Sequence, residues 1–236
     1  MRPPRDSLRG REVVVAGGSG GLGSALTAWL IDEGARVVVS YRQNRERAER
    51  WNEWAVVVQA DLVYEADRNR LLGAAPALYG LVVFAGDPVR DRDMAKSHEA
   101  NYEGPILLAR EAAERMKAAK TPGAIVLLST MQANALFPGS TVYAAQKAAL
   151  QHAARILAKE TRGASGIRVN VVSPGVMAAG MAEASIASRK YERYIQEGVI
   201  GRYGRAEDVA GAVRFLLEPD NHVTGQVVCV DGGMTL

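Results

Sequence analysis

The fold of this chain is decided by the stretch VVVAGGSGGLG, which occupies residues 13–23. Its first four residues are apolar and mostly β-branched, as in a short strand buried inside a sheet. The glycines that follow permit a tight turn, and a helical pattern begins at Gly21, so free backbone N–H groups are expected beside that turn. A strand, a glycine turn and a helix in this order indicate a site for the diphosphate of a dinucleotide. A glycine-rich loop that only turns the chain is the alternative.

Strand-like and helix-like segments alternate along the rest of the chain. Each strand-like run is nearly all apolar, which is typical of parallel strands that are buried on both faces. The strand-like runs are 13–16, 36–39, 55–59, 80–84, 124–128, 168–172 and 226–230, and the helix-like segments are 21–33, 46–54, 65–73, 98–119, 143–162 and 206–218. This alternation predicts one α/β domain over residues 1–236, a doubly wound parallel sheet with helices on both faces.

The end of the second strand-like run, Ser40-Tyr41-Arg42, indicates which dinucleotide is preferred. An acid at this place would bind the adenosine ribose hydroxyls of NAD, and none of the three residues is an acid. The guanidinium of Arg42 can instead pair with the 2′-phosphate of NADP, so we expect NADPH as cofactor in preference to NADH. Asp61 follows the third run, where its carboxylate would accept a hydrogen bond from the adenine amino group or cap the next helix.

A tyrosine and a lysine four residues apart, Tyr143 and Lys147, begin a long helix-like segment. This spacing places both side chains on one helix face. An ammonium near a phenol lowers the pKa of the phenol and allows it to act as a general acid or base. Ser129 and Thr130 end the preceding strand-like run, and a hydroxyl there would hydrogen-bond the carbonyl oxygen of a substrate. A polar strand end without a catalytic role is the alternative.

The alternation of segments is interrupted at residues 177–203, which contain no strand-like run. They follow the turn Ser173-Pro174-Gly175, and a long excursion after a strand is where an open α/β sheet places its ligand crevice. We expect these residues to form a lid over the substrate, with a surface helix pair as the alternative. Apolar residues that would line the pocket, and that favour a hydrophobic or ring-shaped ketone, are Leu136, Phe137, Met177 and Met181.

Composition argues against several classes of partner. The formal net charge is only +3 and the charges are scattered, so a nucleic-acid surface is not expected. No apolar run reaches the ~18–20 residues of a membrane span, and residues 1–10 do not resemble a signal peptide, so we expect a cytoplasmic protein that spans no membrane. Cys229 is the only cysteine, and His98, His152 and His222 lie too far apart for a metal-ligand motif, so no metal is expected.

Taken together, these motifs resemble those of the short-chain dehydrogenase/reductase family over almost the whole chain. The glycine turn is similar to the family's T-G-x3-G-x-G, with Ala16 in place of the threonine. Further strings that carry the resemblance are Asp61-Leu62, Ala85-Gly86, Pro174-Gly175, GRYGRAEDVA at 201–210, TGQ at 224–226 and VDGG at 230–233. The resemblance implies a Rossmann fold and an oxidoreductase that transfers a hydride between NADP(H) and a small-molecule carbonyl or secondary alcohol, most simply a ketoreductase.

The resemblance also implies roles for individual residues. Tyr143 would donate or accept the proton, Lys147 would lower its pKa and bind the nicotinamide ribose, and Asn101 would hold a water in a proton relay. The carbonyl-polarising hydroxyl of the family falls at Thr130, which we therefore expect to act in preference to Ser129. The residues expected to bind the cofactor are Gly17, Ser19, Gly20, Gly21, Leu22, Gly23, Tyr41, Arg42, Asp61, Leu62, Ala85, Gly86, Tyr143, Lys147, Pro174, Gly175 and Val176. Family members often pair two long helices across a dimer axis, which implies a homodimer or homotetramer.

The chain departs from the family pattern at four places. Val83 and Phe84 stand where the family carries two amides, and Ala179 stands where it carries a threonine. Gly20 lies where many NADP-preferring members carry an arginine, and the segment from Gly86 to Asn101 is shorter than usual. These departures keep two alternatives open: a non-catalytic dinucleotide-binding redox sensor, and a relative of the sugar epimerases and dehydratases.

Overall fold

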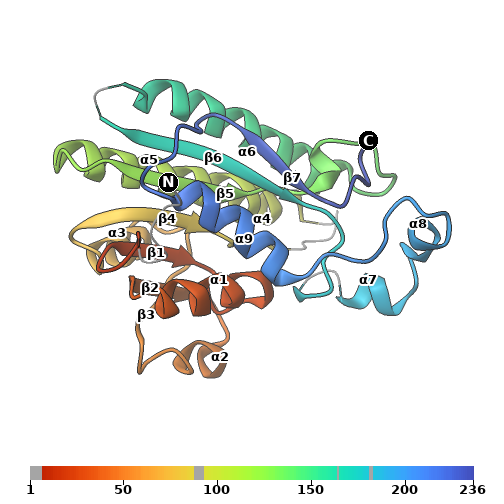
Figure 1. Cartoon of the computed structure of the whole chain (residues 1–236), viewed down its shortest axis with the longest axis horizontal. Coiled ribbons are helices and arrows are strands. Elements are labelled where there is room, and N and C mark those ends of the chain that lie inside the picture. The colour runs from red at the N-terminus through yellow and green to blue at the C-terminus, as the bar shows by residue number, and fades with distance from the viewer. Residues whose placement is uncertain (1–6, 88–92, 164, 181–182) are drawn as a thin grey trace.

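A seven-stranded sheet forms the centre of the protein (Figure 1), in a computed structural model that describes residues 7–87, 93–163, 165–180 and 183–236. All neighbouring strands run parallel, in the order β3-β2-β1-β4-β5-β6-β7. The strands are β1 (Glu12–Ala16), β2 (Arg36–Tyr41), β3 (Ala55–Gln59), β4 (Leu78–Val83), β5 (Gly123–Leu128), β6 (Ile167–Pro174) and β7 (Val227–Val230). The predicted doubly wound α/β fold is confirmed, with each predicted strand found within a few residues of its expected bounds.

Helices cover both faces of this sheet. The helices are α1 (Gly21–Asp32), α2 (Arg45–Glu49), α3 (Glu65–Gly73), α4 (Met94–His98), α5 (Gly104–Ala118), α6 (Thr141–Thr161), α7 (Glu183–Ala187), α8 (Glu192–Gln196) and α9 (Ala206–Leu217), with a π-helical turn at Glu99–Glu103 and a 3-10 turn at Met131–Ala133. Apolar side chains of α3, α5 and α6 pack on one face, and those of α1 and α9 pack on the other. In Figure 1, α7 and α8 extend beyond the end of the sheet.

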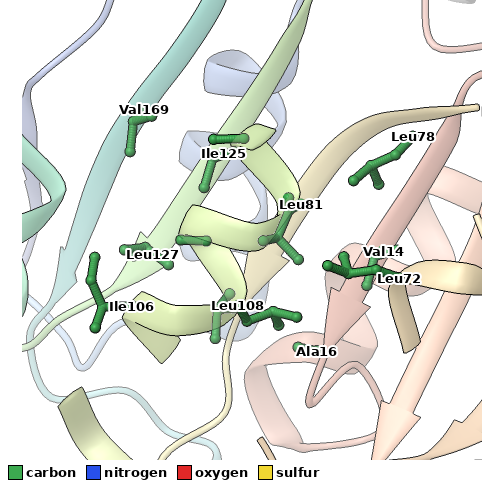
Figure 2. Packing of buried hydrophobic residues seen from close by; sticks show 14 of the residues in the cluster. Val14, Ala16, Leu72, Leu78, Leu81, Ile106, Leu108, Ile125, Leu127 and Val169 are labelled. Carbon is green, nitrogen blue, oxygen red and sulfur yellow. The ribbon is translucent and has the colours of Figure 1, made fainter. Parts of the chain in front are cut away.

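Successive residues of the central strands contribute to two separate cores. In β4, Leu81 and Val83 pack with α5 while Val82 packs with α9, since strand side chains alternate between faces. Figure 2 shows Leu81, together with Ile125 and Leu127 of β5, on the side that carries the α5 residue Leu108. All residues of β4 and β5 are buried, as the nearly continuous apolar runs predicted.

Two predicted helices differ from the structure. The helix expected over 46–54 ends at Glu49, and the chain continues in turns in which Trp54 N–H donates to the Trp51 carbonyl. The helix expected over 98–119 instead begins at Met94 and is interrupted by the π-helical turn. Pro105 explains this interruption, because it has no N–H to donate to the carbonyl of Asn101, four residues earlier.

None of the helices in the described part of the chain combines the length and the apolar character required to cross a lipid bilayer.

A buried and an exposed leucine together test how much the core contributes to the free energy of unfolding. Leu127 is fully buried in β5, whereas Leu136 is fully exposed after the 3-10 turn. We expect Leu127→Ala to lower the free energy of unfolding by about 2–5 kcal/mol, because it leaves a cavity between the sheet and α5. Leu136→Ala should change it by less than about 0.5 kcal/mol. Urea unfolding of both variants measures the difference, and equal losses would contradict the assigned burial.

Candidate active site

The glycine turn lies where the order of the strands reverses. The chain passes from β1 to β2 and β3 on one side and then returns to place β4 on the other side of β1. Such a switch point opens a crevice at the carboxyl ends of the strands. Gly17 follows β1 there with a φ of +78°, and a Cβ on it would lie 3.0 Å from the backbone nitrogen of Ala85, which follows β4.

Two side chains hold the glycine turn in place, and its glycines allow the backbone to pack closely against α1. Ser40 Oγ accepts a hydrogen bond from Gly17 N–H at 3.1 Å, and Thr27 Oγ1 donates to the Gly18 carbonyl at 3.1 Å. A Cβ on Gly23 would lie 2.4 Å from the Gly17 carbonyl oxygen, so the turn can close against α1 only with glycine there. Helix α1 begins without a side-chain cap and without an acid in its first turn, which leaves N–H groups and a positive dipole end for an anion.

A cavity of about 890 Å³ extends from the glycine turn to the start of α6. Among the predicted site residues, Asn101 alone does not line it. The predicted residues that do are Gly17, Ser19, Gly20, Gly21, Leu22, Gly23, Tyr41, Arg42, Asp61, Leu62, Ala85, Gly86, Thr130, Tyr143, Lys147, Pro174, Gly175 and Val176. The tertiary structure therefore brings together residues that lie far apart in the sequence.

One end of the cavity is lined by the residues after β2 and β3. Arg42 forms an ion pair with Asp87, with 2.7 Å between Nη2 and Oδ2. Arg47, from α2, also lines the cavity, so two guanidinium groups lie at this end. Asp61 Oδ1 accepts from the backbone N–H of Val63 at 3.2 Å, whereas α3 begins after Tyr64 without a side-chain cap. The alternative role of Asp61 as a helix cap is therefore wrong.

The other end of the cavity is lined by Tyr143 and Lys147, one turn apart near the start of α6. Lys147 is buried and its Nζ donates to the Leu128 carbonyl at 3.0 Å. Burial lowers the pKa of Lys147 to about 8 and raises the pKa of Tyr143 to about 12. The predicted lowering of the tyrosine pKa is therefore wrong for this cavity, because burial disfavours the charged phenolate.

The two hydroxyls after β5 have different surroundings. Ser129 is buried, and its Oγ donates to the Lys147 carbonyl at 3.2 Å and accepts from Gln151 Nε2 at 2.9 Å. Thr130 is half-buried, and its Oγ1 accepts from the Gln132 N–H at 3.4 Å. The Ser129 hydroxyl therefore holds the backbone of α6, while the donor capacity of the Thr130 hydroxyl is available to a ligand.

Asn101 lies just outside the cavity and is fully buried in the π-helical turn. Its Oδ1 accepts from the Asp87 N–H at 3.0 Å, and its Nδ2 donates to the Asp87 carbonyl at 2.9 Å. The amide of Asn101 thus holds the backbone of the residue whose carboxylate pairs with Arg42. The expected water relay through Asn101 stays a prediction.

Residues after β6 line the cavity, and their role as a lid over the substrate stays a prediction. A Cβ on Gly21 would lie 2.7 Å from the backbone nitrogen of Gly180, so this segment lies directly against the glycine turn. A small apolar cluster supports it, formed by Met131, Val176, Tyr191, Ile200 and Met234. Of the predicted apolar lining residues, Met177 lines the cavity and Met181 lies outside the described residues. The prediction is wrong for Leu136 and Phe137, which do not line the cavity; Leu136 is fully exposed to solvent.

Several lining residues were not singled out in the sequence. Three of them, Ser185, Lys190 and Tyr191, lie in the segment predicted as a lid, and the others include Ser40, Gln43, Asn44, Arg47, Gln132 and Ser140. Among the described residues, no group of three or more histidine, cysteine, aspartate or glutamate side chains could hold a metal ion. The site therefore combines a glycine turn beside an uncapped helix start, two guanidinium groups, a half-buried phenol and a buried lysine in one cavity.

Comparison with known proteins identifies relatives along the whole chain. The family model described as Enoyl-(Acyl carrier protein) reductase matches residues 85–235. An NADPH-dependent aldehyde reductase-like protein, chloroplastic, of Arabidopsis thaliana is 34% identical, over 96% of this chain and 94% of the relative. The 3beta-hydroxysteroid dehydrogenase 1 of Eggerthella lenta is 34% identical, over 98% and 96%. A short-chain type dehydrogenase/reductase from Mycobacterium ulcerans superposes with a TM-score of 0.88 at 27% identity, over 97% of this chain and 90% of that one.

Burial of Lys147 makes the stability of the fold depend on pH. Its folded pKa of about 8 lies below the ordinary 10.5, so between these values the unfolded chain binds the extra proton and the free energy of unfolding rises with pH. Relative to Lys147→Met, the wild type should gain about 1 kcal/mol per pH unit between about pH 8 and 10. Urea unfolding of both proteins at several pH values measures this difference. A difference that stays constant with pH would contradict the lowered pKa.

Proposed function

Because the chain belongs to the short-chain dehydrogenase/reductase family, we propose that it is an NADPH-dependent reductase of ketones or aldehydes in which Tyr143 is the proton donor. Its activity class follows from the family: it is an oxidoreductase that acts on carbonyl compounds and alcohols. The observation that carries the proposal is that Tyr143, Lys147 and Thr130 line the same cavity as the glycine turn.

The residues present fit a dinucleotide. Gly17 and Gly23 leave a cradle that a Cβ would fill, and the uncapped start of α1 adds N–H groups suited to a diphosphate. Tyr41 and Asp61 lie at the end of the cavity that would take the adenosine. Ala85, Gly86, Pro174, Gly175 and Val176 complete the wall between the glycine turn and Tyr143.

Three residues, Tyr143, Thr130 and Lys147, have separate roles in the proposed reaction. When bound, the dinucleotide supplies the hydride, and the protein supplies the proton. Tyr143 is a neutral phenol at physiological pH because burial raises its pKa to about 12, so its hydroxyl serves as a general acid toward a carbonyl oxygen that gains negative charge. Thr130 donates a second hydrogen bond to that oxygen. Lys147, held against the Leu128 carbonyl, directs positive charge toward the nicotinamide ribose and the phenol.

At neutral pH Tyr143 carries its proton, which is the form that carbonyl reduction requires. Asn101 acts in this proposal as a positioning residue, because its amide holds the backbone of Asp87 beside Gly86.

The preference for NADPH rests on the charges at the adenosine end. No acid ends β2, and Arg42 and Arg47 line the cavity there, which suits a 2′-phosphate. Arg42 would exchange its exposed partner Asp87 for the phosphate, at small cost because partly exposed ion pairs contribute little. The NADPH-dependent relative from Arabidopsis thaliana supports the same choice.

Assembly and location complete the proposal. We propose a homodimer or homotetramer joined through α5 and α6, where the apolar side chain of Ile156 is 47% exposed. The single cysteine, Cys229, is free, which agrees with the proposed cytoplasmic location. No specific observation at the site favours the redox sensor or the sugar epimerase.

Replacement of the proposed proton donor tests the mechanism. In Tyr143→Phe we expect kcat for ketone reduction to fall about 10²–10⁴-fold, because the general acid is lost, while the Kd for NADPH changes less than about threefold. The loss of NADPH absorbance measures kcat, and NADPH fluorescence measures binding. Tyr64→Phe is the control, since Tyr64 is 64% exposed outside the cavity. Equal rates in Tyr143→Phe and wild type would refute the mechanism.

Replacement of Arg42 tests the cofactor preference. Arg42→Ala should weaken NADPH binding about 10-fold or more, because a charge-assisted hydrogen bond is lost, and should leave NADH binding nearly unchanged. Titration with both dinucleotides measures the two Kd values. Arg45→Ala is the control, because Arg45 pairs with Glu49 on the surface and does not line the cavity. An equal loss for NADH and NADPH would show that Arg42 does not bind the phosphate.

A further inference from the structure

The cavity has an uneven distribution of charge. The buried Lys147 and the exposed Lys190 both line it. Asp61 is the only acid among the described lining residues, and it lies after β3 at the adenosine end. An electrically neutral ketone would leave the second lysine, Lys190, without a role, whereas an anionic group on the substrate would be attracted to it.

Lys190 lies in the lid between α7 and α8 and has no ion pair among the described residues. Its Nζ lies 5.4 Å from the centre of the Tyr191 ring. The neighbouring acids have other partners, because Glu183 accepts from the Gly180 N–H at 2.8 Å and Glu192 pairs with Arg189. The ammonium of Lys190 is therefore available to an anion within the cavity.

Tyr191 provides a second polar group at the same place. It is only 7% exposed, and its ring packs against Met131, Val176 and Ile200. It lines the cavity, and its hydroxyl has no hydrogen-bond partner among the described residues. The hydroxyl is therefore free to donate a hydrogen bond to an acceptor in the cavity.

We propose that the substrate carries a carboxylate in addition to its reacting carbonyl, and that Lys190 and Tyr191 bind this carboxylate. This inference rests on the proposed function and names the substrate class of that site. One ammonium and one hydroxyl supply donors for the two oxygens of a carboxylate. The apolar wall formed by Met131 and Val176, next to Thr130, contacts the carbon chain between carboxylate and carbonyl.

The position of Tyr191 distinguishes this role from binding of the cofactor diphosphate. Its ring packs on Met131, which directly follows Thr130 after β5. The part of the lid that contacts the glycine turn is instead Gly180, which lies against Gly21. Lys190 and Tyr191 thus belong to the substrate side of the cavity, and their loss should leave the affinity for NADPH unchanged.

The test compares keto acids with their uncharged esters. The substrates are levulinate and longer aliphatic keto acids, each paired with its methyl ester. The kcat and KM for reduction of each are measured for the wild type, Lys190→Gln and Tyr191→Phe. We expect the wild type to favour the acid about 10-fold in kcat/KM. Lys190→Gln should remove this preference by raising KM for the acid about 10-fold, with kcat and the ester unchanged. Tyr191→Phe should raise KM for the acid by a smaller factor.

Arg189→Gln is the matched control, because Arg189 is a neighbouring lid cation that pairs with Glu192 and does not line the cavity. It should leave the acid preference intact. Equal kcat/KM for acid and ester in the wild type would overturn the inference while the proposed reductase stands. A weaker affinity of Lys190→Gln for NADPH would also overturn it, since the lysine would then serve the cofactor.

A binding measurement separates this inference from the proposed function. Calorimetry with valerate, which has no carbonyl to reduce, should show binding to the wild type, weaker binding to Lys190→Gln and no binding of the neutral amide. Lys190-dependent valerate binding without turnover of any carbonyl would refute the reductase and support the anion site. Valerate binding that does not depend on Lys190 would refute the anion site.

Discussion

The contact between the backbones of Gly17 and Ala85 is the constraint on which the rest of the site depends. It lies at the split between β1 and β4, where the order of the parallel strands reverses. Because no side chain fits between the two backbones, the glycine turn lies close against the residues that follow β4. The uncapped start of α1 then faces the cavity. The cavity, the guanidinium groups at one end and the phenol at the other are all placed by this one close approach.

Burial sets the chemistry at the opposite end of the cavity. Lys147 is enclosed between α6 and β5, and its contact with the Leu128 carbonyl connects the helix to the strand that also carries Thr130. The same burial that makes Lys147 costly to protonate keeps Tyr143 protonated, so one desolvated region gives the two groups opposite tendencies. Burying these two ionisable groups costs free energy, and the apolar packing of the fully buried strands β4 and β5 offsets that cost.

Local sequence patterns predicted most of the scaffold. The apolar runs identified every strand, because parallel strands buried on both faces need such runs, and the glycine turn and the Tyr143–Lys147 spacing identified both ends of the site. The helix expected over 46–54 stopped at Glu49, and the helix through Asn101 changed to a π-helical turn. Periodicity could not show either change, although Pro105 was a local signal for the second.

The sequence alone determined the order of strands and helices along the chain, the glycine turn after the first strand and the Tyr143–Lys147 pair on one helix face, because these depend on contacts between near neighbours in the chain. Only the tertiary structure decided that the Ser129 hydroxyl bonds to the Lys147 carbonyl, that Arg42 meets Asp87, and that Lys190 and Tyr191 line the cavity. It also decided the direction of the Tyr143 pKa. Desolvation and long-range pairing depend on what surrounds a side chain in space, and that information is distributed over segments that meet only when the chain folds.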